Sequence, residues 1–163
     1  MDARGFDYVV DKEYKKAAPG TVLSVTPKAG SEVTEGTKVQ LTVAKPVPVL
    51  PDVVGLSQKD ALRELREMDY RVDTRIVFSS QARGQVLEES PQPGTERLPG
   101  QEVNLTLASG CDANYSGCLN PLASDYDCAG GTGDGPLYTG YVRVTGIDTF
   151  DLDSDSDGIG CES

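Results

Sequence analysis

The clearest predicted strand is Glu102–Ala108, where apolar and polar residues alternate as in a strand with one buried face. Arg71–Val77 is also predicted to be a strand, and Gln85–Ser90 is predicted to be another that ends at Pro91. Within Arg71–Val77 we expect Val72 and Ile76 to point inward. The alternating apolar residues of the clearest strand are Val103, Leu105 and Leu107. Together the stretches predict a small three-stranded sheet.

A short helix is predicted just before the first of these strands. Ser57 is a good helix N-cap, and Asp60 stands three residues later, at the capping-box position. The apolar residues that follow at helical spacing are Ala61, Leu62, Leu65 and Met68. Residues 46–109 therefore predict a complete α+β module in which one helix packs on a three-stranded sheet.

The chain contains an internal repeat. Shifting residues 20–44 by 64 positions onto residues 84–108 matches turn formers and alternating apolar positions without a gap. The matched pairs are Gly20/Gly84, Val22/Val86, Leu23/Leu87, Pro27/Pro91, Gly30/Gly94, Glu32/Glu96, Gly36/Gly100, Val39/Val103, Leu41/Leu105, Thr42/Thr106 and Ala44/Ala108. Residues 1–45 are thus a partial copy that starts at Gly5–Val10 without the helix, and we expect it to be truncated or rearranged. The proline-rich Lys45–Pro51 predicts a stiff, extended connection.

The composition favours several small cores over one large core. Apolar residues make up 37% of the 163 residues, with no Trp and only three Phe. The net charge of −11 is concentrated after residue 110, where ten acidic residues accompany one basic residue, Arg143. Nucleic acid is a poor partner for such a surface, because its phosphates need Lys and Arg. No apolar run approaches the about 20 residues of a membrane span, and we expect any targeting segment to lie outside this sequence.

All four cysteines lie in residues 111–163. An even number of cysteines in a short, loop-rich segment is typical of a disulfide-stapled domain in an oxidising compartment. A zinc site is the alternative, but the sequence has no CxxC pair and no histidine. Four cysteines allow three pairings. We favour Cys111–Cys118, which closes a short loop, and Cys128–Cys161, whose longer loop removes more unfolded-state entropy.

An acidic loop lies near the end of the sequence, where Asp153, Asp155 and Asp157 alternate with serines before Gly158. Alternation lets the three carboxylates turn toward one point, where their mutual repulsion favours a bound cation. Ca²⁺ is the natural candidate because it prefers several oxygen ligands. The D-x-D-x-D-G opening matches the first half of an EF-hand loop, but Glu162 is the tenth residue rather than the twelfth. The alternative is a solvated acidic tail.

Residues 50–109 resemble a PASTA domain, and residues 5–44 share the resemblance in part. The residues that carry it are Val53-Val54-Gly55-Leu56-Ser57, Val86-Leu87, Ser90-Pro91, Pro93-Gly94-Thr95, Pro99-Gly100 and Val103–Leu107. PASTA domains are small extracellular α/β modules of bacterial cell-wall synthases and serine/threonine kinases. The resemblance therefore implies binding of peptidoglycan or muropeptide fragments, or a spacer role in the envelope.

Residues 111–163 resemble the Excalibur family, an extracellular calcium-binding region with the hallmark D-x-D-x-D-G-x-x-C-E. The hallmark positions are filled by Asp153, Asp155, Asp157, Gly158, Cys161 and Glu162, and Cys128 matches the upstream cysteine. The resemblance implies that four carboxylates and the backbone carbonyl of Ile159 hold Ca²⁺. The four carboxylates are those of Asp153, Asp155, Asp157 and Glu162. We expect the further acids Asp148 and Asp151 to be solvated surface.

These observations predict a non-enzymatic, extracellular or wall-associated bacterial protein, in which PASTA-like modules dock to or space from peptidoglycan and a stapled tail binds Ca²⁺. One alternative is the sensor ectodomain of a serine/threonine kinase or penicillin-binding protein. Another is the accessory region of a secreted hydrolase or nuclease. Asp125 and Asp127 could form a glycosidase dyad, but nothing in the sequence places them about a cleft. Without histidine, the usual Ser/His and Cys/His nucleophile arrangements are excluded.

Overall fold

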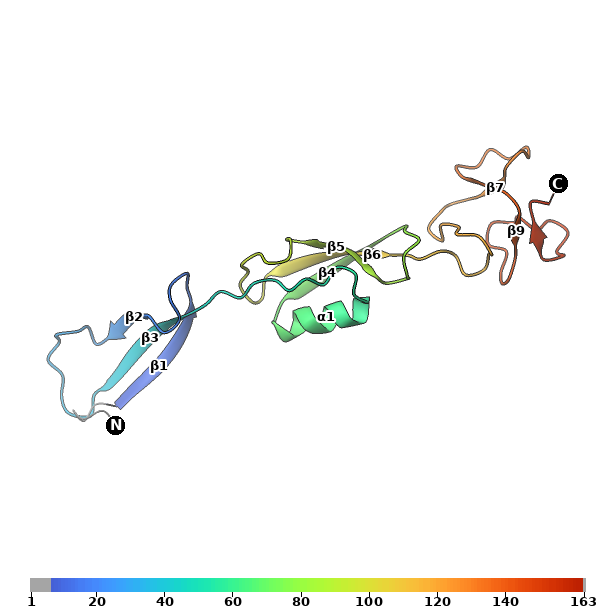
Figure 1. The fold of residues 1–163 in the computed structure, drawn as a ribbon. Coiled ribbons are helices and arrows are strands. Elements are labelled where there is room, and N and C mark those ends of the chain that lie inside the picture. The colour runs from blue at the N-terminus through green and yellow to red at the C-terminus, as the bar shows by residue number, and fades with distance from the viewer. Residues whose placement is uncertain (1–6, 163) are drawn as a thin grey trace. The chain divides into compact units, whose positions relative to one another are not determined.

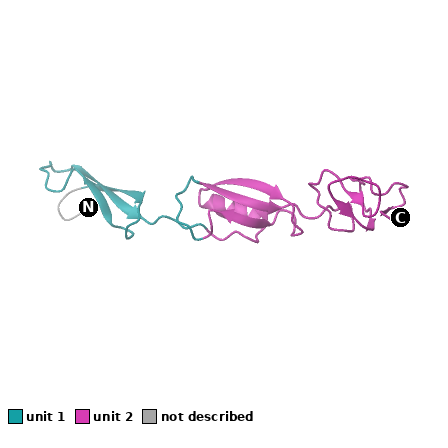
Figure 2. Ribbon diagram, turned by 90° about the horizontal axis from the view of Figure 1, so that it is seen from above, with its two compact units in different colours: residues 1–50, 94–101 teal, residues 51–93, 102–163 magenta. Residues whose placement is uncertain are grey.

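The computed structural model describes residues 7–162, which form two compact units. One unit comprises residues 1–50 and 94–101, and the other comprises residues 51–93 and 102–163 (Figure 2). The expected start of the first module at Gly5 lies outside the described residues. Within the described part of the chain, no helix is long and apolar enough to cross a membrane.

The first unit contains a three-stranded sheet formed by β1 (Asp7–Tyr14), β2 (Val22–Thr26) and β3 (Lys38–Lys45). The strand order is β1-β3-β2, with β1 parallel to β3 and β2 antiparallel to it (Figure 1). The partial copy of the repeat therefore forms all three strands of the predicted sheet.

The second unit contains the helix and the three strands of the second module, which are α1 (Gln58–Glu67), β4 (Arg71–Val77), β5 (Val86–Ser90) and β6 (Glu102–Ala108). Its strand order, β4-β6-β5, and its strand directions repeat those of the first sheet. Figure 1 shows α1 lying along one face of this sheet. The predicted helix and three strands are confirmed, and β5 starts at Val86, one residue later than expected.

The helix begins at the predicted capping box. The Asp60 N–H donates to Ser57 Oγ at 3.2 Å, and the Ser57 hydroxyl donates to Asp60 Oδ2 at 2.7 Å. The buried face of the helix presents Ala61 and Leu65. The buried apolar residues of the sheet are Val86, Val103, Leu105, Leu107 and Ala108. The inward orientation predicted for Ile76 is wrong, because this residue near the end of the edge strand β4 is 60% exposed.

The first sheet has no helix over it among the described residues, and its apolar side chains are correspondingly more exposed. Val22 is 51% exposed, whereas its repeat counterpart Val86 is 1% exposed. Val39 and Leu41 are likewise only half-buried. The two modules therefore share a sheet but differ in how its apolar face is covered.

Residues 111–162 fold around two disulfides and a small core. The structure pairs Cys111 with Cys118 and Cys128 with Cys161, as predicted. Four two-residue strands form two pairs, β7 (Asp127–Cys128) with β8 (Tyr138–Thr139), and β9 (Val142–Arg143) with β10 (Ile159–Gly160). The core residues are Tyr115, Leu119, Tyr126, Val142, Phe150 and Leu152. The expected combination of α+β modules with a disulfide-stapled, loop-rich tail is found.

Candidate metal centre and ligand pocket

The acidic loop curls around the carboxylate of Asp153. Asp153 Oδ1 accepts the N–H of Asp157 at 3.1 Å, and Oδ2 accepts the N–H of Gly158 at 2.8 Å. Asp157 Oδ1 in turn accepts the N–H of Ile159 at 2.9 Å. Gly158 has a φ of 91°, which glycine adopts without steric strain. The loop bends because its own carboxylates bind its backbone N–H groups.

The alternate aspartates of the loop converge. Possible ligand oxygens of Asp153, Asp155 and Asp157 lie within 4.8 Å of one another. Asp153 is 9% exposed, and the other two are exposed. A carboxylate offers about four lone-pair sites, so Asp153 can accept both N–H groups and still bind a cation. Three such carboxylates fit a hard cation such as Ca²⁺, which takes about six to eight oxygen ligands.

Glu162 is not part of this group of three aspartates, but their negative charges raise its pKa. The negative charge of Asp157 is the largest effect that raises the pKa of Glu162, followed by desolvation and the charge of Asp155. Glu162 also borders a small hollow of about 170 Å³, together with Asp155 and Ile159. Ligation by Glu162 and by the Ile159 carbonyl stays a prediction.

Asp148 is not the solvated acid expected from the sequence, because it binds the residues that lead into the loop. Its Oδ1 accepts the Tyr115 hydroxyl at 2.8 Å and the Leu152 N–H at 3.1 Å, and its Oδ2 accepts the Asp153 N–H at 2.8 Å. Burial alone would raise the pKa of Asp148, but these three hydrogen bonds outweigh burial and lower the pKa. Burial also raises the pKa of Tyr115 to about 12. Asp148 is therefore a structural support for the loop.

The disulfide between Cys128 and Cys161 anchors the far end of the loop. The Cys161 N–H donates to the Leu152 carbonyl at 3.2 Å, so the two ends of the loop meet. Both cysteines pack against the small core of the tail. Asp151, the other extra acid, is exposed, as expected.

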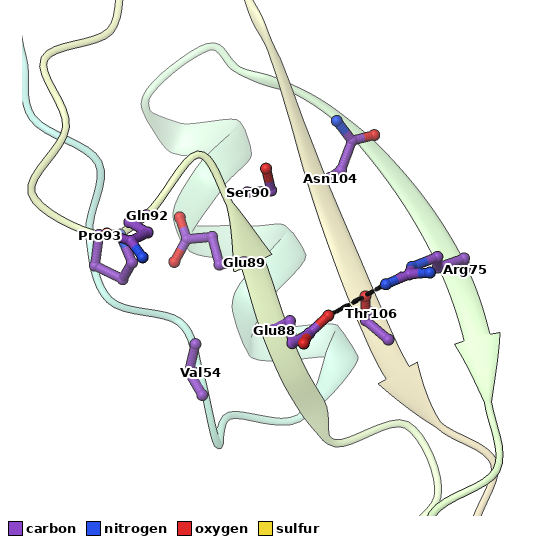
Figure 3. A pocket seen from close by; sticks show the side chains of 9 residues that line it. All are labelled: Val54, Arg75, Glu88, Glu89, Ser90, Gln92, Pro93, Asn104 and Thr106. Atoms are coloured by element: carbon purple, nitrogen blue, oxygen red, sulfur yellow. Dashed lines mark hydrogen bonds and ion pairs between the residues drawn. The ribbon is translucent and has the colours of Figure 1, made fainter.

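A surface hollow of about 830 Å³ lies along β5 of the second module (Figure 3). At one end, Arg75 donates to Thr106 Oγ1 at 2.9 Å and to Glu88 Oε2 at 3.2 Å. Glu89 and Val54 also line the hollow. Charged, polar and apolar groups thus share one concave surface, which suits a ligand with both polar and alkyl parts.

The family model of the PASTA domain matches residues 1–45 and 48–109. The chain belongs to the PASTA domain family. The two sheets and α1 are the PASTA modules, and the hollow along β5 lies on the second of them. The match ends before the tail, so the Excalibur resemblance of residues 111–163 stays a prediction.

Several relatives of this PASTA chain are bacterial kinases. The probable serine/threonine-protein kinase PknB of Corynebacterium glutamicum is 29% identical over 119 residues, which cover 69% of this chain and 18% of the kinase. The probable serine/threonine-protein kinase CE0033 of Corynebacterium efficiens is 31% identical over 116 residues, covering 68% of this chain and 18% of that protein. The chain therefore spans less than a fifth of these relatives.

Among solved structures, the three-PASTA-domain region of a Ser/Thr kinase from Staphylococcus aureus is similar to this chain. The two share 22% sequence identity with a TM-score of 0.39, and the match covers 66% of this chain and 57% of the other.

Sequence reasoning missed two acids with structural consequences, Asp148 and Glu89. Asp148 binds Tyr115, which lies 33 positions away in the sequence, so no local pattern marks the pair. Glu89 did carry a signal, because the repeat aligns it with Val25 of the first PASTA module. An acid in place of an apolar residue within a strand that is shared by both repeats is therefore the signal that marks Glu89.

Proposed function

We propose that this chain is the extracellular sensor region of a bacterial serine/threonine kinase, in which PASTA modules bind fragments of peptidoglycan. The observation that carries the proposal is the match to two kinases, which covers more than two thirds of this chain and 18% of each kinase. The two disulfides support a location outside the cytoplasm. In this role the chain binds a ligand, and catalysis belongs to another part of the protein.

The kinase relatives favour this sensor over the free wall-associated protein that the sequence suggested first. The full-length coding sequence decides between them. A membrane span and a kinase domain in the same reading frame support the sensor. Their absence from the complete gene product contradicts it and leaves a wall-docking protein.

Sedimentation with purified cell wall tests docking itself. The intact chain is expected to sediment with peptidoglycan and to be released by soluble muropeptides in excess. Cellulose, which lacks the peptide part of the wall, serves as the control polymer. Equal sedimentation with both polymers, or none with either, contradicts binding by the PASTA modules.

The tail supports a second function, binding of Ca²⁺ by the loop of Asp153, Asp155 and Asp157. The convergence of these three carboxylates favours this function. Extracellular Ca²⁺ sites have dissociation constants of about 10⁻⁴–10⁻³ M. At about 10 mM Ca²⁺, binding to the folded state alone then stabilises the tail by about 1.4–2.7 kcal/mol.

Thermal unfolding of the tail, followed with and without Ca²⁺, tests this second function. The wild-type chain should melt at a higher temperature in Ca²⁺, and the double variant Asp155→Asn/Asp157→Asn should lose the increase. The matched control is Asp134→Asn, which removes an acid of the tail outside the loop. An increase that persists in the double variant would show that the ion binds elsewhere.

A further inference from the structure

Glu89 is a buried acid with one unsatisfied oxygen, beside the hollow of Figure 3. The residue is only 7% exposed. Its Oε2 accepts the Val53 N–H at 3.3 Å, whereas its Oε1 has no hydrogen-bond partner within residues 7–162. A buried oxygen without a partner has given up its hydration without a replacement, which lowers the stability of the fold.

The first module has an apolar residue at this position. The repeat places Val25 of the first module at the position of Glu89. The two residues also have the same register, because Val25 pairs with Leu41 and Glu89 pairs with Leu105, its repeat counterpart. The first sheet therefore has a half-buried valine at the register position where the second sheet has a buried acid. A buried acid with an unsatisfied oxygen, at a position that is apolar in the other module, is typical of a functional position.

The surroundings of Glu89 suit a positively charged ligand. Burial raises the pKa of Glu89, and the negative charges of Asp52 and Glu64 raise the pKa further. The guanidinium group in the same hollow, that of Arg75, already pairs with Glu88 at 3.2 Å. The acid therefore lies among other negative charges, and a ligand cation would relieve their repulsion.

We propose that Glu89 binds the primary ammonium group of a ligand seated in this hollow. An ammonium group brings three donors and a positive charge, so it can satisfy Oε1 and neutralise the carboxylate together. Val54 and Pro93 line the same hollow and offer apolar surface to the methylene groups that carry the amine. Ser90 and Asn104 offer polar partners for amide or hydroxyl groups. The ligand class is an alkyl amine carried by a peptide or sugar.

The view in Figure 3 separates the two charged ends of the hollow. The carboxylate of Glu89 turns toward Gln92 and Pro93, whereas Glu88 turns toward Arg75, with which it pairs. The amine would reach Glu89 by way of the turn that contains Gln92 and Pro93. At the other end the charges of Arg75 and Glu88 cancel, so Glu89 is the carboxylate left for the ammonium group to bind.

This inference rests on the proposed binding of peptidoglycan and narrows it to fragments with a free amine. The test is calorimetric titration of the full chain with a muropeptide that carries a free side-chain amine. The same muropeptide after N-acetylation and free 1,5-diaminopentane are titrated in parallel. Glu89→Gln removes the charge but keeps the shape, and Glu88→Gln is the matched control on the neighbouring residue.

The acetylated muropeptide is expected to bind the wild-type chain about 10- to 100-fold more weakly than the free muropeptide, because a charge-assisted hydrogen bond is lost. The free muropeptide should bind Glu89→Gln more weakly than wild type by the same factor. Glu88→Gln should change the affinity by less than about threefold, because its charge is already paired and exposed. Glu89→Val, which copies the first module, should behave like Glu89→Gln. Amide NMR spectra establish that each variant is folded.

Equal muropeptide affinity for Glu89→Gln and wild type would overturn the inference and leave wall docking in place. If the wild-type chain does not bind the muropeptide, the proposed binding of peptidoglycan is contradicted instead. If the wild-type chain then still binds 1,5-diaminopentane and Glu89→Gln does not, Glu89 is an amine site whose ligand is a free diamine. Failure of both ligands to bind the wild-type chain overturns the inference as well.

Discussion

Replacing one leucine in each module by alanine tests how much the helix stabilises the second sheet. Leu41 and Leu105 occupy the same position in the two repeats. Leu105 is 1% exposed in the module that carries α1, whereas Leu41 is only half-buried. We therefore expect Leu105→Ala to destabilise its module far more than Leu41→Ala destabilises the other.

The expected magnitudes follow from burial. Leucine to alanine at a fully buried site costs about 2–5 kcal/mol, because the lost transfer free energy adds to the cavity left behind. Complete burial of a leucine side chain contributes about 1.5–3 kcal/mol. Leu41 is partly exposed, so less of this contribution is at stake than at Leu105, and we expect a loss of about 1–2 kcal/mol. In a module of this size, about 1 kcal/mol shifts the melting temperature by about 4–8 °C.

Native-state hydrogen exchange is the suitable assay, because it assigns a loss of stability to individual strands. Leu105→Ala should weaken the protection of β6 amides, and Leu41→Ala should weaken that of β3 amides to a smaller extent. Lys38→Ala, at an exposed position of β3, is the control and should stay within about 0.5 kcal/mol of wild type. Equal losses at the two leucines would refute the idea that the helix makes the difference between the modules.

Glu89→Gln should raise the melting temperature of the second module at neutral pH, because burial raises the pKa of Glu89 and the buried charge is therefore destabilising. This gain should shrink as the pH falls through the raised pKa, because protonation then neutralises Glu89 in the wild-type chain as well. Thermal melts at a series of pH values measure the change. Asp148→Asn should destabilise the tail by about 1–3 kcal/mol, because an amide nitrogen cannot replace the oxygen that accepts the Asp153 N–H. Denaturant unfolding measures this loss, with exposed Asp151→Asn as a control that should change little. Ser57→Ala should cost about 1 kcal/mol of helix stability, seen as weaker amide protection in the first helical turn.

The elements of the second module could be predicted because they depend on local patterns. The alternation in Glu102–Ala108 reflects a strand with one buried face, and the structure gives the same bounds. The Ser57 cap fixed the start of the helix, because its hydroxyl binds a donor only three residues away. The structure has the disulfide pairing that we favoured, although the sequence alone allows three pairings.

The acids that matter most in the structure could not be identified from local patterns, because their partners are distant in the sequence. Glu89 lies 36 positions from Val53, whose N–H it accepts. Asp148 lies 33 positions from the Tyr115 hydroxyl. The prediction that Ile76 points inward was wrong for a related reason. Alternation predicts the face of the sheet on which a side chain lies, but not whether another element covers that face at an edge strand. Periodicity describes the element, whereas burial depends on its neighbours.

The tail shows why an acidic loop and a disulfide occur together where the core is small. Asp148 fixes the start of the loop by accepting the N–H groups of Leu152 and Asp153. The Cys161 N–H fixes its end by donating to the Leu152 carbonyl at 3.2 Å, and the disulfide ties Cys161 to Cys128. A loop closed at both ends has already lost much of the chain entropy that ion binding would otherwise have to overcome. The Ca²⁺ affinity proposed for this loop should therefore depend on the disulfide as well as on the carboxylates.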